Sequence, residues 1–385
     1  MKDKGQKHHR MPVSRDPFAL VSVDRAVSEL RRGRPIVILG SAGSAVLALS
    51  TEGATPEILK MIALASGSSP NLTMSGKRAT LIGLTDQEAS VATITSKKGF
   101  NANTIQALAD PLSNDLISKK LNFSVALKDK FAFDCESASV SIAKIARLLP
   151  ATVTAKILIS NDQDVFKWCS RWDFLSVDAG DIFQYEKTAA RSLRIVSRAR
   201  TPIGGALEAE IIAFRPLDGG LEHLAIVIGK PNAKKSVLAR IHSECFTGDL
   251  LGSLRCDCGD QLQGALAAIK SSGAGILLYL AQEGRGIGLT NKLRAYELQD
   301  RGFDTIDANE QLGFNADERI YLPSVSMLNL LEFTSINLMT NNPEKVSALR
   351  RFGIKVAKRV PLTFPSNEHN KLYLETKVIK SGHYF

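Results

Sequence analysis

The second half of the chain alternates between strand-like apolar runs and helix-like segments that end at glycine. Residues 275–280 form a continuous apolar run that reads as a strand, and residues 290–301 have the pattern of a helix. Strand patterns return at 336–339 and 354–360, separated by a helix that starts at a capping sequence with Pro343 in its first turn. Strands that alternate with helices indicate an α/β domain with a mixed or parallel sheet.

The first half of the chain also contains helix-like and strand-like patterns, but fewer of them. Residues 20–34 have the spacing of an amphipathic helix, and residues 35–39 read as a buried strand. Pro56 suits the first position of a second helix, and a further helix is expected over residues 137–149. From there to about residue 195 we expect strands and loops.

The length of 385 residues exceeds what one typical core supports, so two domains are expected. The segment 198–205, with its proline and paired glycines, has the composition of a boundary. The expected fold class is α/β (α+β), with two domains that are each a mixed sheet with packed helices. The expected divisions are a disordered basic tail at 1–18, domains at 19–195 and 198–370, and a C-terminal tail at 371–385.

Composition excludes several classes of protein. Hydrophobic content of 44% is ordinary for a globular chain, and no run of eighteen apolar residues could span a membrane. The N-terminus lacks the apolar core of a signal peptide, which together with clustered cysteines indicates a reducing cytoplasm. The net charge of +10 is spread along the chain beyond the basic tail. It therefore fits a polyanionic small molecule as well as a nucleic acid.

Three of the five cysteines, Cys245, Cys256 and Cys258, fall within fourteen residues. Three thiolates leave a tetrahedral zinc one ligand short, and an open position distinguishes a catalytic zinc from a structural one. The alternatives are buried inert thiols, or a disulfide that leaves one cysteine over. The spacing favours a metal site.

Two segments could hold phosphate groups at the start of a helix. Residues 283–289 place three alternating glycines and Arg285 between a strand and a helix, although the spacing departs from the dinucleotide-binding fingerprint. Residues 340–345 likewise join a strand end to a helix, with Lys345 one turn in. Either segment alone could be an ordinary turn or helix entry. Together with a zinc, they suggest hydrolysis of a phosphorylated substrate.

Two short carboxylate motifs could move protons. His242 and Glu244 resemble the acid/base half of zinc nucleobase deaminases, but the Pro-Cys-x-x-Cys that follows in those enzymes is absent. Asp317 and Arg319 lie two residues apart, which on an ordinary surface is a charged turn.

Taken together, these segments resemble GTP cyclohydrolase II, in family order from about residue 198 to the C-terminus. The resemblance implies hydrolysis of GTP to 2,5-diamino-6-(5-phospho-ribosylamino)pyrimidin-4(3H)-one, formate and diphosphate, the first step of riboflavin biosynthesis. The matching stretches are Arg240-Ile-His-Ser-Glu-Cys-Phe-Thr-Gly-Asp249, Ser253-Leu-Arg-Cys-Asp-Cys-Gly259 with Gln261, Glu283-Gly-Arg285, Asn291-Lys-Leu-Arg-Ala-Tyr296, Gly313-Phe-Asn-Ala-Asp-Glu-Arg319 and Thr340-Asn-Asn-Pro-Glu-Lys345.

The resemblance also assigns roles to residues. It implies one zinc per chain, held by Cys245, Cys256 and Cys258, which activates the water that attacks C8, and magnesium on the triphosphate. Among the catalytic positions, Asp317 corresponds to the proton acceptor, Arg319 to the nucleophile at the α-phosphate and Tyr296 to a tyrosine near the base. The implied GTP contacts are Arg240, Ile241, His242, Ser243, Glu244, Gln261, Glu283, Gly284, Arg285, Thr305, Thr340 and Lys345.

The first half resembles 3,4-dihydroxy-2-butanone 4-phosphate synthase in residues 23–37, 54–57 and 65–67. That family uses an acidic loop to bind magnesium, together with a catalytic histidine. Here residues 40–46 contain no carboxylate, and no histidine occurs between His9 and His223. Magnesium needs hard oxygen ligands, so we expect a retained fold without the synthase activity.

The expected protein is therefore a zinc-dependent GTP cyclohydrolase II fused to an inactive synthase-like domain. GTP is the expected partner, with no nucleic acid and no membrane, and the family implies a homodimer. One alternative is a bifunctional enzyme that also makes 3,4-dihydroxy-2-butanone 4-phosphate from ribulose 5-phosphate. Another is a zinc-stabilised GTP-binding regulator without turnover.

Overall fold

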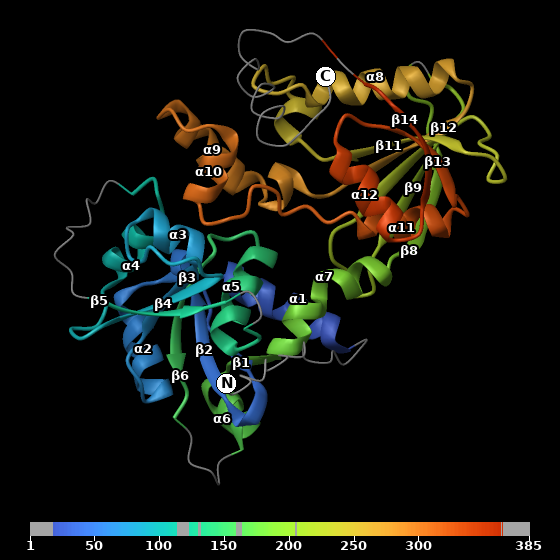
Figure 1. Cartoon of the computed structure of the whole chain (residues 1–385). Coiled ribbons are helices and arrows are strands. Elements are labelled where there is room, and N and C mark those ends of the chain that lie inside the picture. Colours follow the sequence, from blue (N-terminus) through green and yellow to red (C-terminus); the bar gives the residue numbers. More distant parts are fainter. Residues whose placement is uncertain are drawn as a thin grey trace, which may run out of the picture. The chain divides into compact units, whose positions relative to one another are not determined.

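A computed structural model of the chain describes residues 18–113, 123–129, 132–158, 164–204, 206–362 and 364 (Figure 1). The predicted basic tail, apart from its last residue, and the predicted C-terminal tail lie outside these residues. The chain divides into two compact units: Met1–Glu186 with Ala308–Ala316, and Lys187–Asp307 with Asp317–Phe385. Among the described helices, none is long and apolar enough to cross a membrane.

The first unit contains a seven-stranded, mostly antiparallel sheet. Its strand order is β5-β4-β3-β6-β2-β1-β7, and only the β1–β7 pair is parallel. The strands are β1 (Ile36–Leu39), β2 (Ala45–Ser50), β3 (Asn71–Ser75), β4 (Val91–Ser96), β5 (Phe123–Lys128), β6 (Ala151–Lys156) and β7 (Leu175–Asp178). The helices of this part of the chain are α1 (Phe18–Arg31), α2 (Pro56–Ser66), α3 (Gly76–Leu81), α4 (Ala102–Ala109), α5 (Cys135–Ile145), α6 (Val165–Trp172) and α7 (Ala179–Arg191).

The helix predicted at 20–34, the strand at 35–39 and the helix beginning at Pro56 are confirmed. The apolar face of α1 packs with β1, β2 and α5 in one buried cluster. Helix α2 begins at Pro56, with the Thr55 hydroxyl accepting a hydrogen bond from the Ile58 amide at 3.3 Å, and ends at Gly67 with φ +71°. The helix predicted over 137–149 is present as α5, displaced toward the N-terminus.

The prediction of strands and loops up to residue 195 is wrong, because α6 and α7 lie there. The sequence did carry a signal for α6, because Val165, Trp168, Cys169 and Trp172 recur at the i, i+3, i+4 and i+7 spacing of an amphipathic helix. In α6 only Cys169 is buried, and the Trp168 and Trp172 rings pack against Phe174. The prediction therefore missed a helical period that is present in the sequence.

The second unit contains a seven-stranded mixed sheet of order β14-β13-β11-β12-β10-β9-β8. Strands β12, β11, β13 and β14 are mutually parallel, and β12, β10, β9 and β8 are antiparallel. The strands are β8 (Arg194–Arg200), β9 (Ala209–Arg215), β10 (His223–Ile228), β11 (Val237–Ser243), β12 (Gly275–Leu280), β13 (Ser335–Met339) and β14 (Lys355–Val360). The helices of this region are α8 (Cys258–Ser271), α9 (Leu289–Asp300), α10 (Thr305–Gln311), α11 (Leu322–Leu330) and α12 (Pro343–Arg351).

Both faces of this second sheet are buried. Along β12, Ile276, Leu278 and Leu280 join the cluster that contains residues of α11 and α12, whereas Leu277 joins the cluster that contains residues of α8. Figure 1 shows α8 on one side of the sheet and α11 and α12 on the other. The continuous apolar run at 275–280 is therefore a strand, as predicted, and it is buried along its length apart from the half-buried Tyr279.

The central strand β11 is not among the strands expected from the sequence. Its odd-numbered residues Val237, Ala239 and Ile241 enter the cluster with α11 and α12, but Arg240 and His242 interrupt the apolar run between them. These two polar side chains are nevertheless buried, at 6% and 3% exposure. A buried polar pair in the middle of a sheet indicates a site rather than a core.

The three parallel strands β11, β12 and β13 deliver their carboxyl ends to one edge of the sheet. Glu244 and Cys245 follow β11, Gln282 and Glu283 follow β12, and Thr340 follows β13. In α/β sheets this edge is where ligands bind.

Candidate functional site

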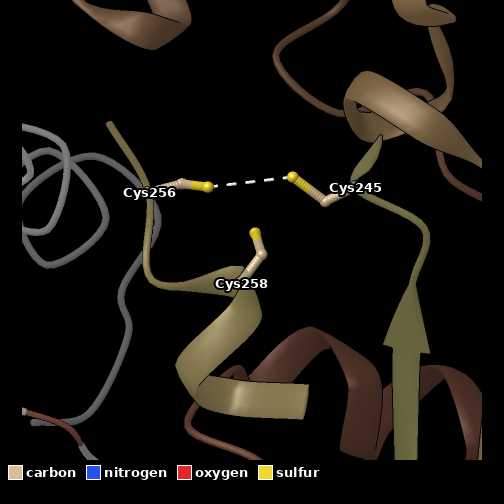
Figure 2. A group of neighbouring side chains, drawn as sticks. All are labelled: Cys245, Cys256 and Cys258. Atoms are coloured by element: carbon tan, nitrogen blue, oxygen red, sulfur yellow. Dashed lines mark hydrogen bonds between the residues drawn. The ribbon is translucent and has the colours of Figure 1, made fainter. Parts of the chain in front are cut away.

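The three clustered cysteines lie together at this edge of the sheet. Cys245 follows β11, Cys258 is the first residue of α8, and Cys256 lies on the turn before it. Their sulfurs all lie within 4.8 Å of one another and point toward a common centre (Figure 2). The Sγ atoms of Cys245 and Cys256 are 3.7 Å apart, which matches the roughly 3.8 Å between two sulfurs of a tetrahedral zinc. The donor set therefore fits a thiophilic divalent metal.

The two competing interpretations of the cysteines do not fit this geometry. All five cysteines are free, so the disulfide alternative is wrong. Inert buried thiols would not converge on one point, whereas Cys135 and Cys169 are isolated and burial raises the pKa of each thiol to about 11.

A short π-helix, η3 (Phe246–Leu250), brings a glycine against the three clustered cysteines. A Cβ atom on Gly248 would lie 2.7 Å from the Cys256 sulfur, 3.0 Å from the Cys245 sulfur and 2.8 Å from the Cys258 Cβ. Real Cβ atoms do not approach other heavy atoms so closely. Glycine at this position is therefore a condition for the three sulfurs to converge.

The three thiols do not ionise independently. Hydrogen bonds from Cys256 and Cys258, helped by the nearby Lys292 ammonium, lower the pKa of Cys245. The Cys245 sulfur in turn raises the pKa of Cys256 to about 11 and raises that of Cys258. Ionisation of Cys245 therefore opposes ionisation of the other two thiols, and binding of a divalent cation would release their protons.

The Asp249 side chain links the three clustered cysteines to the sheet by hydrogen bonds. One of its carboxylate oxygens accepts hydrogen bonds from the Cys245 amide at 3.0 Å and from the Tyr279 hydroxyl at 2.8 Å, and the other lies 3.0 Å from His242 Nε2. Burial lowers the pKa of His242 despite this carboxylate. Asp249 is a functional candidate that the sequence reasoning did not assign, although it stands four residues after Cys245.

Tyr296 lies on α9 beside the cysteines. Its hydroxyl is 3.4 Å from the Thr247 hydroxyl, and the Arg255 guanidinium lies over its ring at 5.0 Å. The Lys292 ammonium is 5.7 Å from the same ring. Burial raises the pKa of Tyr296, so the phenol remains protonated at neutral pH.

Buried cations line the sheet edge beside the cysteines. Arg240 donates to the Met339 carbonyl at 3.0 Å and to the Gln261 side chain, and burial lowers its pKa to about 10. The Lys345 ammonium donates to the Ile241 carbonyl at 2.9 Å. These groups come from β11, α8 and α12, which explains why residues distant in sequence belong to one predicted set.

Two buried polar atoms near these cations have no hydrogen-bond partner among the described residues. They are Arg240 Nε and the Tyr321 hydroxyl. The Arg319 guanidinium and the Lys345 ammonium each lie 5.9 Å from the Tyr321 ring. Unsatisfied buried donors are costly, so their presence beside cations is consistent with an anionic ligand that accepts from them. Tyr321 is a second residue that the sequence reasoning did not assign.

Asp317 and Arg319 form a close ion pair. Arg319 Nε donates to both carboxylate oxygens of Asp317, at 2.9 and 3.1 Å. Burial opposes the charge on Asp317, but the Arg319 guanidinium outweighs it and lowers the pKa of the carboxyl. The carboxylate is therefore ionised, and the ion pair holds the guanidinium in a fixed orientation.

The glycine-rich turn after β12 forms a kinked 3-10 turn, η4 (Glu283–Gly286), with Gly284 and Arg285 both in the left-handed region at φ +64° and +61°. The Glu283 side chain points into the protein, where one oxygen accepts from the Phe246 amide at 2.6 Å and the other from Lys292. Its carboxylate therefore positions the cysteine loop.

The remaining predicted GTP contacts lie at strand ends or farther away. Ser243 accepts a hydrogen bond from Gln282 at 3.1 Å, the Glu244 amide donates to the Leu280 carbonyl at 2.8 Å, and the Thr340 hydroxyl accepts from the Asn342 amide at 3.0 Å. Thr305 begins α10 and accepts from Gln299 at 3.3 Å. No hydrogen bond among the described residues joins Thr305 to the other predicted contacts.

The site places three thiols beside buried guanidinium and ammonium groups at the carboxyl edge of the parallel strands. This arrangement is typical of α/β proteins that combine a metal with an anionic ligand. A family model described as GTP cyclohydrolase II matches residues 194–361. A GTP cyclohydrolase-2 of Azospirillum brasilense is 48% identical over 96% of this chain and 95% of that protein. The chain therefore belongs to the GTP cyclohydrolase II family.

Two further similarities extend over both units. The riboflavin biosynthesis protein RibBA of Synechocystis is 34% identical, over 94% of this chain and 71% of that protein. The crystal structure of RibBX, a two-domain 3,4-dihydroxy-2-butanone 4-phosphate synthase from A. baumannii, covers 89% of this chain and 99% of that chain, with 16% identity and a TM-score of 0.38.

Proposed function

We propose that the chain hydrolyses GTP to the diaminopyrimidinone ribosyl phosphate, formate and diphosphate, as a step of riboflavin biosynthesis. The convergence of Cys245, Cys256 and Cys258 on one point supports this proposal most directly, because a three-thiolate set leaves a metal one open position for reaction. Membership in the GTP cyclohydrolase II family supports GTP as the substrate.

Zinc is the metal that this donor set fits best, at one ion per chain. Thiolates select zinc or other thiophilic ions over magnesium, which prefers oxygen ligands. When bound, zinc supplies Lewis-acid activation for hydrolysis at C8 of the guanine ring. Magnesium is assigned to the triphosphate of the substrate.

We propose that one group of side chains acts at the guanine ring of GTP and another group acts at its triphosphate. Tyr296, beside the cysteine cluster, orients the second water or donates a proton during the release of formate. Asp317 accepts a proton and Arg319 acts at the α-phosphate, where their ion pair fixes both groups. The sheet-edge cations Arg240 and Lys345 are suited to hold the phosphates, because each is buried and already oriented by a backbone carbonyl.

The other proposed GTP contacts surround these groups at the carboxyl edge of the sheet. The Gln261 side chain is held by Arg240 and Asp257. The remaining proposed contacts are Ile241, His242, Ser243, Glu244, Glu283, Gly284, Arg285, Thr305 and Thr340.

The first unit is proposed to be a synthase-like domain, within residues 19–195, without synthase activity. Residues 40–46 connect β1 to β2 through a 3-10 turn, η1 (Ser41–Gly43), and offer only small apolar and hydroxyl side chains. The cyclohydrolase domain is placed at 198–370. A homodimer in a reducing cytoplasm completes the proposal, and the five free cysteines are in keeping with such a compartment.

Replacement of a metal ligand tests the proposal. The purified chain should bind about one zinc and release formate and diphosphate from GTP, and Cys256→Ser should lose both the zinc and formate release. Cys169→Ser is the matched control, because Cys169 is a buried thiol of the first unit outside the cluster. If Cys256→Ser kept full zinc and full formate release, the metal assignment would be wrong.

A further inference from the structure

A buried ammonium group lies directly against the cysteine cluster. Lys292, on α9, is only 9% exposed, and its Nζ lies 3.0 Å from the Cys245 sulfur. The same Nζ donates to the Thr247 hydroxyl at 2.8 Å and to Glu283 Oε1 at 3.0 Å. An ammonium has three hydrogens, so these three acceptors satisfy it completely.

The charge of this lysine pairs with the buried Glu283 carboxylate as well as with the Cys245 sulfur. A buried ammonium is costly unless paired, and a lysine that only filled space could be replaced by an apolar residue. Its partners are one metal-ligand candidate and two groups that control the loop carrying that ligand. Thr247 lies on the π-helix after Cys245, and the second oxygen of Glu283 accepts from the Phe246 amide at 2.6 Å.

The charge balance of the cluster calls for a cation. Three thiolates around a divalent metal leave one excess negative charge in a largely buried place, and the Glu283 carboxylate, 3% exposed, adds another nearby. A fixed positive charge 3.0 Å from one sulfur offsets this excess at the point where it is greatest. Outer groups that hydrogen-bond to metal ligands commonly set both ligand orientation and metal affinity.

We propose that Lys292 is a positioning residue of the metal centre: its ammonium fixes the Cys245 sulfur as a thiolate ligand and, through Thr247 and Glu283, holds the loop that carries it. This inference rests on the proposed metal site and adds a residue that acts through Cys245 rather than on the substrate. Lys292 thus contributes to metal affinity, in addition to any effect on turnover.

Zinc affinity, measured by competition with a chromogenic chelator under reducing conditions, tests this role. Lys292→Met keeps the length and apolar stem but removes the charge, and should weaken zinc binding by about 10- to 100-fold. Lys292→Arg keeps the charge and should restore most of the affinity. Arg301→Met is the control, because it removes an exposed positive charge just after the same helix, where Arg301 pairs with Glu297 at 3.3 Å.

The outcomes separate this inference from the metal site itself. If the unchanged chain binds no zinc, the proposed metal site fails. If the unchanged chain and Lys292→Met bind zinc equally tightly, only the role of Lys292 is overturned. The role is also overturned if Met and Arg variants lose affinity equally, since the charge would then not matter. Should Lys292→Met fail to fold, as judged by circular dichroism, Lys292→Arg decides: retained affinity supports the role, and lost affinity refutes it.

Discussion

Gly248 offers a direct test of how closely the loop supports the three sulfurs. Alanine at this position would place a Cβ 2.7 Å from the Cys256 sulfur and 3.0 Å from the Cys245 sulfur, where ordinary contacts begin near 3.4 Å. The sulfurs or the π-helix must therefore move by several tenths of an ångström. Metal–ligand distances vary by only about 0.2 Å from their ideal values, so a displacement of this size would distort the coordination of the metal.

The expected cost of Gly248→Ala follows from overpacking. Added methyl groups in tight places typically cost about 1 to 3 kcal/mol. If this cost destabilises only the metal-bound state, zinc affinity should fall by roughly 5- to 150-fold. The backbone at Gly248 does not lie in the left-handed region, so the effect is steric rather than conformational.

Zinc competition titrations of the purified variant would measure this loss. Gly204→Ala is the matched control, because a Cβ there meets nothing within 4 Å and its φ is not positive. Zinc binding by Gly248→Ala that equals that of the unchanged chain would refute the idea that the glycine is required for the sulfurs to converge.

Three further outcomes are expected. Arg319→Ala should abolish diphosphate release from GTP, whereas metal-free protein should retain some of it; near-normal turnover of Arg319→Lys would reduce the arginine to a source of charge. Tyr296→Phe should lower the formate yield by roughly 100-fold or more, with a ring-opened formamide detected by mass spectrometry, and an unchanged yield would limit Tyr296 to packing. The chain should make no 3,4-dihydroxy-2-butanone 4-phosphate from ribulose 5-phosphate with magnesium, because residues 40–46 lack carboxylates; rescue of a synthase-deficient, riboflavin-requiring strain by this chain would contradict that expectation.

Secondary structure could be predicted from the sequence where the local apolar pattern agrees with the burial of the residues. The apolar run at 275–280 is buried on both faces, and the helix start at Pro56 is confirmed together with its Thr55 cap. The prediction fails at 165–172 although the local signal is present. Val165, Trp168, Cys169 and Trp172 have the spacing of one helix face, and the segment is so short that this period covers only two turns.

The site shows the same division. The cysteines could be grouped from their spacing, because the ligands of one metal are close in sequence. Lys292 could not be singled out, since α9 carries other polar residues and its burial depends on Cys245, forty-seven positions away. Tyr321 resembles an ordinary core aromatic, and only its unpartnered hydroxyl in the structure marks it as a candidate ligand group.

The cysteine cluster and the buried cations of the candidate site can form at different times during synthesis of the chain. Cys245, Cys256 and Cys258 lie within fourteen residues, so a short loop closure brings them together. Arg240, by contrast, reaches the Met339 carbonyl across ninety-nine positions. During synthesis from the N-terminus, the cysteine segment emerges well before β13 and α12 exist. The proposed metal ligands can therefore gather on a nascent chain, whereas the cations proposed to hold the phosphates reach their positions only when the last strands join the sheet.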